Sequence, residues 1–189
     1  MNAEHDGPRI PPPVAAQWSD AQKAAAARVL SSRGGAMRGP FGVMLWVPEL
    51  LDRAQHLGEY LRLQCSIPVD LRELAILAAA RHWRQEYEWQ VHAPLAVASG
   101  VEAAVVEAVR AGRRPRGLRR EQRAVLDFCR QLHRKHGVDD AVFEAARAVL
   151  GREGVVELCA LCGYYAMLAM LLNVAGTPPP RPAEAVFDR

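Results

Sequence analysis

Apolar residues recur along this chain at spacings of three and four, which is the pattern of helices that bury one face. The repeat is clearest after Pro48, where it takes in Leu50, Leu51, Ala54, Leu57, Tyr60 and Leu61. Comparable patterns predict further helices over residues 20–31, 71–80, 85–98, 101–111, 120–136, 140–150 and 155–174. No segment shows the alternation of a half-buried strand. The pattern therefore predicts an all-α protein.

Residues that favour helix ends support these boundaries. Asp70 precedes the helix over 71–80, and Glu73 stands three residues after it, as in a capping box. Gly137 is expected to end the helix over 120–136, because glycine readily takes the left-handed conformation that closes a helix.

Both ends of the chain differ from this helical middle. Residues 1–17 and 177–189 each contain four prolines and show no periodicity. The first segment is predicted to be an extended or disordered arm and the second a C-terminal arm. Between them, residues 18–176 are predicted to form a single helical domain.

Composition narrows the class of protein. A chain of 189 residues, half of them hydrophobic, can bury a sizeable core, and a formal charge of +3 is too small to indicate nucleic acid or a membrane surface. The longest apolar stretch, over 158–175, is interrupted by Cys, Gly and Tyr, so no membrane span is expected. The N-terminus lacks the basic and apolar regions of a signal peptide. Four cysteines do not form a disulfide framework in a chain of this size, which indicates a reducing, cytoplasmic setting.

The candidate chemistry centres on residues 81–92. Glu88 and His92 are four residues apart, so on a helix they lie on the same face. Glu73 lies in the apolar helix just upstream. A carboxylate on one helix and a carboxylate with a histidine on the next is the pattern of an acid–base pocket. The alternatives are a structural hydrogen bond between Glu88 and His92, and a helix-capping role for Glu73.

Other candidates are less well supported. Cys159 and Cys162 could form a redox pair or half of a metal site, but they lie in the most apolar helix with no second Cys or His pair nearby, which favours core packing. Glu88 and His92 lack the second histidine of a zinc helix, so no metal is expected. His82 lies ten residues before His92 and could reach the pocket.

The middle of the chain resembles the carboxymuconolactone decarboxylase superfamily, which includes the alkylhydroperoxidase AhpD-like proteins. The similar segments are Arg38-Gly-Pro, Tyr60-Leu-Arg62, Arg72-Glu-Leu-Ala-Ile-Leu, Tyr87-Glu-Trp-x-x-His and Gly163-Tyr-Tyr, with Asn173 closing the last helix. They lie within about two thirds of the chain. The resemblance implies an AhpD-like helical bundle that associates as a homo-oligomer, commonly a dimer, trimer or hexamer.

The resemblance also separates two chemistries. The peroxidase-type members carry a Cys-x-x-Cys before the histidine and a relay glutamate one helix upstream, which corresponds here to Glu73. In this chain the two cysteine positions are Gln85 and Glu88. Neither side chain can replace the thiolate that attacks a peroxide. The decarboxylase-type members instead have Glu-x-x-x-His, matched by Glu88 and His92.

The sequence therefore predicts an enzyme, a cofactor-independent lyase or isomerase acting on a small carboxylated lactone or related carbonyl compound. Its catalytic residues would be Glu73, Glu88 and His92, and the substrate would contact His82, Gln85 and Tyr87. Two alternatives remain: an alkylhydroperoxidase-like redox protein, and a non-enzymatic oligomer that binds a small ligand.

Overall fold

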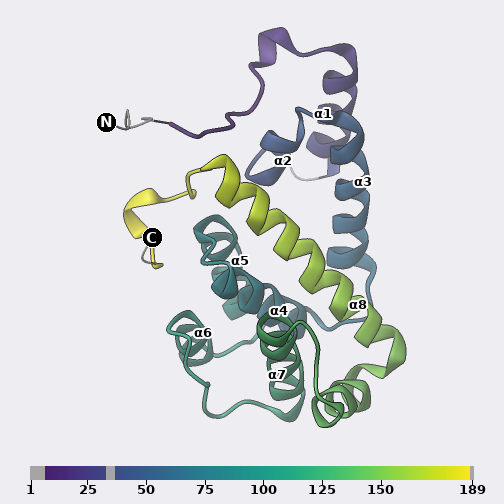
Figure 1. Ribbon diagram of the computed structural model, residues 1–189, viewed down its shortest axis with the longest axis vertical. Helices are drawn as coiled ribbons and strands as arrows, with labels where there is room; N and C mark the ends of the chain where they lie inside the picture. Colours follow the sequence, from purple (N-terminus) through teal and green to yellow (C-terminus); the bar gives the residue numbers. More distant parts are fainter. Residues whose placement is uncertain (1–6, 33–36, 188–189) are drawn as a thin grey trace.

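The structure is a computed structural model that describes residues 7–32 and 37–187. This part of the chain is helical, without strands (Figure 1). The α-helices are α1 (Asp20–Ser32), α2 (Pro40–Met44), α3 (Pro48–Glu59), α4 (Val69–His82), α5 (Glu86–Ala98), α6 (Ala103–Arg110), α7 (Arg120–Lys135) and α8 (Asp140–Ala175). A π-helical turn, η2 (Tyr60–Gln64), continues α3, and short 3₁₀ turns occur at Ala15–Gln17 and Pro182–Glu184.

Helix α4 is the centre of the core. It packs against α5, α7 and α8, and every residue from Leu71 to Ala80 except Arg72 is buried. A helix that is apolar on all sides is stable only when other helices cover each side. In Figure 1, α8 runs diagonally between the N-terminal helices α1 to α3 and the group formed by α4 to α7.

The start of α4 differs from the prediction. The helix begins at Val69 with Pro68 at the N-cap, so Glu73 is its fifth residue and lies too far along to cap it. Asp70 is instead ion-paired with Arg119 from the segment before α7. The predicted capping box is therefore wrong, and the carboxylate of Glu73 is left to face the interior.

The end of α7 also differs in detail. His136 takes the left-handed conformation, with φ of 62°, and its amide closes the helix on Leu132. The residue predicted for this role, Gly137, lies one position further on. The helix boundary is nevertheless within one residue of the prediction.

Helix α8 contains both of the last two predicted helices. They meet at Gly151, whose φ of 72° and ψ of −177° are not helical and turn the chain there. In the part of the chain described, α8 is the one helix that is long and apolar enough, by length and composition alone, to cross a membrane. The sequence analysis did not anticipate this. Half of the qualifying stretch is buried inside the bundle, as in the core helix of a folded domain.

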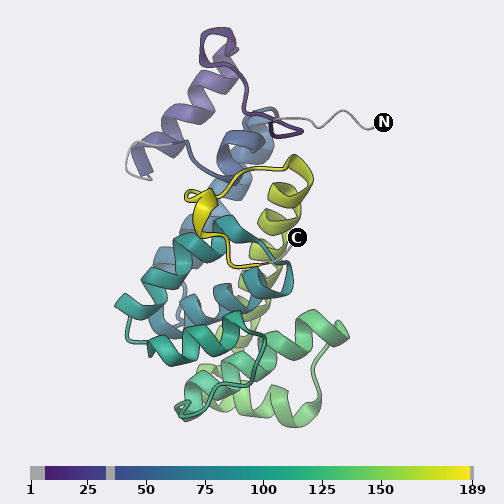
Figure 2. The same cartoon turned by 90° about the vertical axis from the view of Figure 1, so that its left-hand side faces the viewer.

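The terminal segments lie against the bundle. The amide of Ile10 donates to the carbonyl of Ala175 at 3.1 Å, which ties the N-terminal segment to the end of α8. Residues 177–187 cross α5 (Figure 2). We call this C-terminal segment the strap. The outermost residues of both predicted arms, 1–6 and 188–189, lie outside the described residues.

Candidate active site

The turn between α4 and α5 sets the relation of the two helices that supply the candidate residues. Gln85 caps α5, its side-chain oxygen accepting from the amide of Tyr87 at 2.6 Å. Asn173 of α8 accepts from the side chain of Gln85 and donates to the carbonyl of Trp83, both at 2.9 Å. One side chain of α8 thus fixes the turn from both sides.

Glu73, Glu88 and His92 lie together in the interior. Nδ1 of His92 is 2.7 Å from Oε2 of Glu73, and Nε2 is 3.5 Å from Oε2 of Glu88. All three side chains are nearly completely buried. Because an ionised carboxylate only accepts, the contact with Glu73 places a proton on Nδ1 and leaves Nε2 facing Glu88. We call these three residues the Glu–His–Glu triad.

Two tyrosines stand beside the triad. The ring of Tyr165 meets the ring of His92 edge-on, with centroids 5.1 Å apart and planes at 90°. Burial raises the pKa of Tyr165 well above its usual range, and the nearby Glu88 adds to this. Burial, with Glu88, also raises the pKa of Tyr87. Both phenols therefore remain neutral hydrogen-bond donors at physiological pH.

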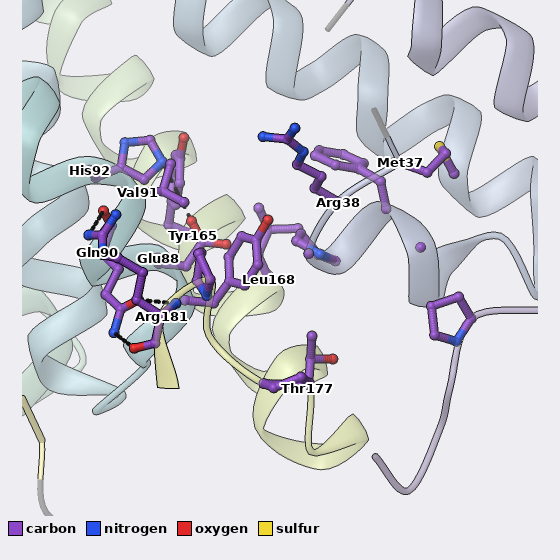
Figure 3. A pocket seen from close by; sticks show the side chains of 18 of the residues that line it. Met37, Arg38, Glu88, Gln90, Val91, His92, Tyr165, Leu168, Thr177 and Arg181 are labelled. Carbon is purple, nitrogen blue, oxygen red and sulfur yellow. Dashed lines mark hydrogen bonds and ion pairs between the residues drawn. The ribbon is translucent and has the colours of Figure 1, made fainter. Parts of the chain in front are cut away.

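A cavity of about 980 Å³ opens next to the triad. Glu88, His92, Tyr87 and Tyr165 line it, together with the arginines Arg38, Arg62 and Arg181. Figure 3 shows His92 and Tyr165 on one side of the cavity, with Arg38 opposite. The cavity therefore combines buried acid–base groups with cationic side chains in its wall.

The strap forms part of the cavity wall, and a proline in α5 frees one of the groups that hold it there. Pro94 lies inside α5 and has no amide hydrogen, so the carbonyl of Gln90 loses its usual helical partner. Nη2 of Arg181 approaches that carbonyl at 3.5 Å. The side chain of Gln90 also pairs with the backbone of Arg181 in both directions, each at 2.9 Å. The strap is thus attached to α5 beside the cavity.

A second attachment lies at the far end of the strap. Glu86, at the first position of α5, accepts from the amides of Val186 and Phe187. The Phe187 ring packs edge-on against Trp89, and the guanidinium of Arg81 lies 5.6 Å from its centroid. Side chains of α4 and α5 therefore hold the strap at two places, Arg181 in its middle and Val186 with Phe187 at its far end.

No protein-family model matches the chain. No curated protein matches it either. Solved structures do match. The AhpD core of an uncharacterized peroxidase-related protein from Ralstonia eutropha JMP134 aligns with a TM-score of 0.75 and 19% identity, over 98% of this chain and 100% of that one. This chain has the AhpD-like fold.

Two other structures with the AhpD-like fold show how varied such proteins are. A cysteine-to-alanine variant of the debrominase Bmp8, solved with 2,3,4-tribromopyrrole, aligns with a TM-score of 0.72 and 15% identity over 98% of this chain and 96% of that one. A protein of unknown function from Agrobacterium tumefaciens aligns at 0.66 and 16%, over 73% and 95%. The resemblance noted in the sequence is confirmed at the level of the fold.

Of the three residues predicted to contact substrate, one lies in the cavity wall and two do not. Tyr87 lines the cavity, whereas Gln85 is buried at the helix cap and His82 lies outside the lining. His82 is exposed and stacks on His133, with ring centroids 5.1 Å apart. The end of α4 carries it to the side that faces α7. We therefore assign only Tyr87 of these three to the cavity wall.

The residues that the sequence analysis did not single out are Arg62, Tyr165 and Arg181. Tyr165 belongs to the Gly163-Tyr-Tyr segment of the resemblance, so a signal for it was present. Arg62 belongs to the Tyr60-Leu-Arg62 segment of the resemblance, so it also had a signal. Arg181 had none, because it reaches the cavity from the strap. Among the described residues, no three His, Cys, Asp or Glu side chains are grouped to hold a metal ion.

Proposed function

We propose that this protein is a cofactor-independent lyase or isomerase that moves a proton on a small carboxylated lactone or related carbonyl compound. The observation that supports this is the buried Glu–His–Glu triad at the wall of a cavity, with one ring nitrogen of His92 held by Glu73 and the other directed toward Glu88. Such an arrangement suits proton transfer, because the imidazole is held in one tautomer and orientation.

The proposed chemistry follows from this arrangement. When a carboxylated lactone loses carbon dioxide, the electron pair of the broken carbon–carbon bond stays on the substrate and must be protonated. Glu88 or His92 would deliver that proton, and Glu73 would hold the imidazole in place while its charge changes. The phenol of Tyr165 could donate a hydrogen bond to the oxygen that becomes negative. No metal or cofactor is needed for this sequence of steps.

The substrate's carboxylate would be held by arginine. Arg62 lines the cavity. Burial raises the pKa of Tyr165, and the positive charge of Arg62 opposes this rise. It forms no hydrogen bond or ion pair with the other residues that the structure describes. Its position in η2 brings it there, and π-helical turns are often found at functional sites. Arg38 approaches the same cavity from the segment before α2.

Replacing Arg62 with Gln should weaken the binding of a carboxylated lactone by roughly tenfold to a hundredfold, because a hydrogen bond to a charged group contributes about 1.5–3 kcal/mol. Titration calorimetry with γ-carboxymuconolactone would measure this. The matched control is Arg123→Gln, which removes an exposed arginine of α7 that does not line the cavity. Equal effects of the two variants would refute the role of Arg62.

The direct test of the proposed function is the release of carbon dioxide from γ-carboxymuconolactone, compared with the rate in buffer. A parallel assay follows the consumption of cumene hydroperoxide. Turnover of the lactone alone supports the proposal. Turnover of the peroxide alone favours the redox alternative, and binding of the lactone without turnover favours the ligand-binding alternative.

We also propose that the chain forms a homo-oligomer. Leu57, Tyr60 and Leu63 recur at a spacing of three on α3 and η2, and all are exposed. The hydroxyl of Tyr60 donates to Glu157 of α8 at 2.5 Å, and Val156, the residue before Glu157, is exposed as well. Leu63 and Val156 are 72% and 69% exposed, and exposed large apolar residues of this kind often mark contact surfaces between chains.

Light scattering at micromolar concentration should give a mass above that of one chain. Leu63→Asp should lower that mass, because a carboxylate at the centre of an apolar interface opposes association. Val97→Asp is the matched control, since Val97 is an exposed apolar residue of α5, away from this surface. A single-chain mass for the unaltered protein would refute the proposal.

A further inference from the structure

A second group of reactive side chains lies where α4, α7 and α8 meet. Sγ of Cys162 in α8 is 3.5 Å from Sγ of Cys129 in α7, and both residues are buried. His133 is four residues after Cys129, so both lie on the same face of α7. His82, at the end of α4, stacks on His133. None of these residues lines the cavity beside the triad.

The two thiols are not equivalent. The contact with Cys129 lowers the pKa of Cys162 to about 6, against the effect of burial, and the neighbouring His133 lowers it further. The same contact, together with burial, raises the pKa of Cys129 well above its usual range. Cys162 is therefore the thiol of the pair that gives up its proton more readily.

The other cysteines do not share this setting. Cys159 is exposed as a residue, and the loss of water around its sulfur, together with the nearby Cys162, raises the pKa of its thiol. Cys65 directly follows η2 and donates to the carbonyl of Leu61 at 3.0 Å. Core packing alone would explain two buried cysteines, but it does not explain why Cys162 also lies beside the imidazole of His133. The sequence spacing suggested only Cys159 with Cys162 as a possible pair and favoured core packing for both, whereas the structure brings Cys162 against Cys129 of another helix.

We propose that Cys129 and Cys162 are a redox-active dithiol, which a small hydroperoxide oxidises to a disulfide that links α7 to α8. The two sulfur atoms need to approach from 3.5 Å to about 2.0 Å. Hydrogen peroxide is the fitting oxidant, because it is neutral and close to water in size and so can enter a packed interior.

The reaction balances without another partner. The thiolate of Cys162 attacks one oxygen of the peroxide, the O–O bond breaks, and the hydroxide that leaves takes a proton to become water. Cys162 is then a sulfenic acid. Cys129 attacks its sulfur, the S–O bond breaks, and the departing hydroxide takes the proton of Cys129. Two thiols and one peroxide become one disulfide and two waters.

The test is to treat the full-length protein with hydrogen peroxide, block the remaining thiols, and map the products after digestion with trypsin under non-reducing conditions. Trypsin places Cys129 in the peptide 124–130 and both Cys159 and Cys162 in the peptide 153–189, since Arg181 precedes a proline. We expect these two peptides to be joined, with the mass of two hydrogens lost, and to separate again after dithiothreitol.

Two variants show whether Cys159 or Cys162 supplies the sulfur that is joined to Cys129. Cys159→Ala should form the same link as the unaltered protein, whereas Cys162→Ala should not form it. Because Cys162→Ala alters a buried position, circular dichroism is needed to show that this variant still folds. The peptide map of the unaltered protein tests the link without relying on any variant. Peptides that stay separate, a link that requires Cys159, or a link between two chains would each overturn the proposal. The result does not depend on the acid–base function, because no residue of the triad takes part.

Discussion

Replacing His92 with glutamine should lower turnover of the carboxylated substrate by about a hundredfold or more, because a positioned acid–base group typically contributes that much. Glutamine can still donate a hydrogen bond to Glu73, but it cannot take up and release a proton near neutral pH. Glu88→Gln should have an effect of the same order if Glu88 delivers the proton. The measurement is the steady-state rate of each variant, compared with that of the unaltered protein under the same conditions.

The choice of glutamine follows from burial. If Glu88 and His92 were an exposed pair four residues apart on one helix, their contact would contribute only about half a kilocalorie per mole. The partner of His92 across the helices, Glu73, is nearly completely buried, as is His92 itself. His92→Ala would leave the carboxylate of Glu73 without a donor, at a cost of about 3–5 kcal/mol to stability. The control is Cys159→Ala, an exposed position outside the cavity, which should keep full turnover. Full turnover by the folded His92→Gln variant would end the catalytic assignment.

Gly39→Ala should lower both the stability of the protein and its affinity for ligand. Gly39 has φ of +56° and ψ of −130°, a conformation that costs a residue with a side chain about 1–3 kcal/mol. A Cβ at this position would also lie 2.5 Å from Cε1 of Tyr87. The ring of Tyr87 would have to swing within the cavity that it lines. Urea unfolding and titration calorimetry would measure the two effects.

Gly117→Ala separates the backbone cost from the overlap. Gly117 also has a positive φ, of 72°, but a Cβ there meets no atom within 4 Å. We expect Gly117→Ala to lose some stability and to bind ligand normally. If the two alanine variants were alike in both measurements, the contact between Gly39 and Tyr87 would have no role in shaping the cavity.

The sequence was most informative where one helix determines the outcome. Helical periodicity predicted the bundle because each helix buries an apolar face. The spacing of Glu88 and His92 placed them on one face of α5, and the apolar surroundings of Glu73 indicated that its side chain points inward. These are local properties, so a single sequence contains them.

What the sequence did not predict depends on which segments meet in space. Cys162 was considered with Cys159, its neighbour in sequence, but α7 brings Cys129 against it from 33 residues away. His82 was assigned to the cavity because it is close to His92 in sequence, yet the turn after α4 leaves it facing α7. The capping box failed for a local reason: Pro68 allowed α4 to start earlier, and Glu73 moved out of capping range.

The two ends of the chain contribute to the cavity wall. Pro8 and Pro12 lie on one part of it, and Thr177, Pro178, Pro180 and Arg181 lie on another, while the helices behind them bury the triad. These segments hold few core residues, so their sequences can change at little cost to folding. Evolution could therefore alter the size and charge of accepted substrates by lengthening or exchanging the termini, with the acid–base groups untouched.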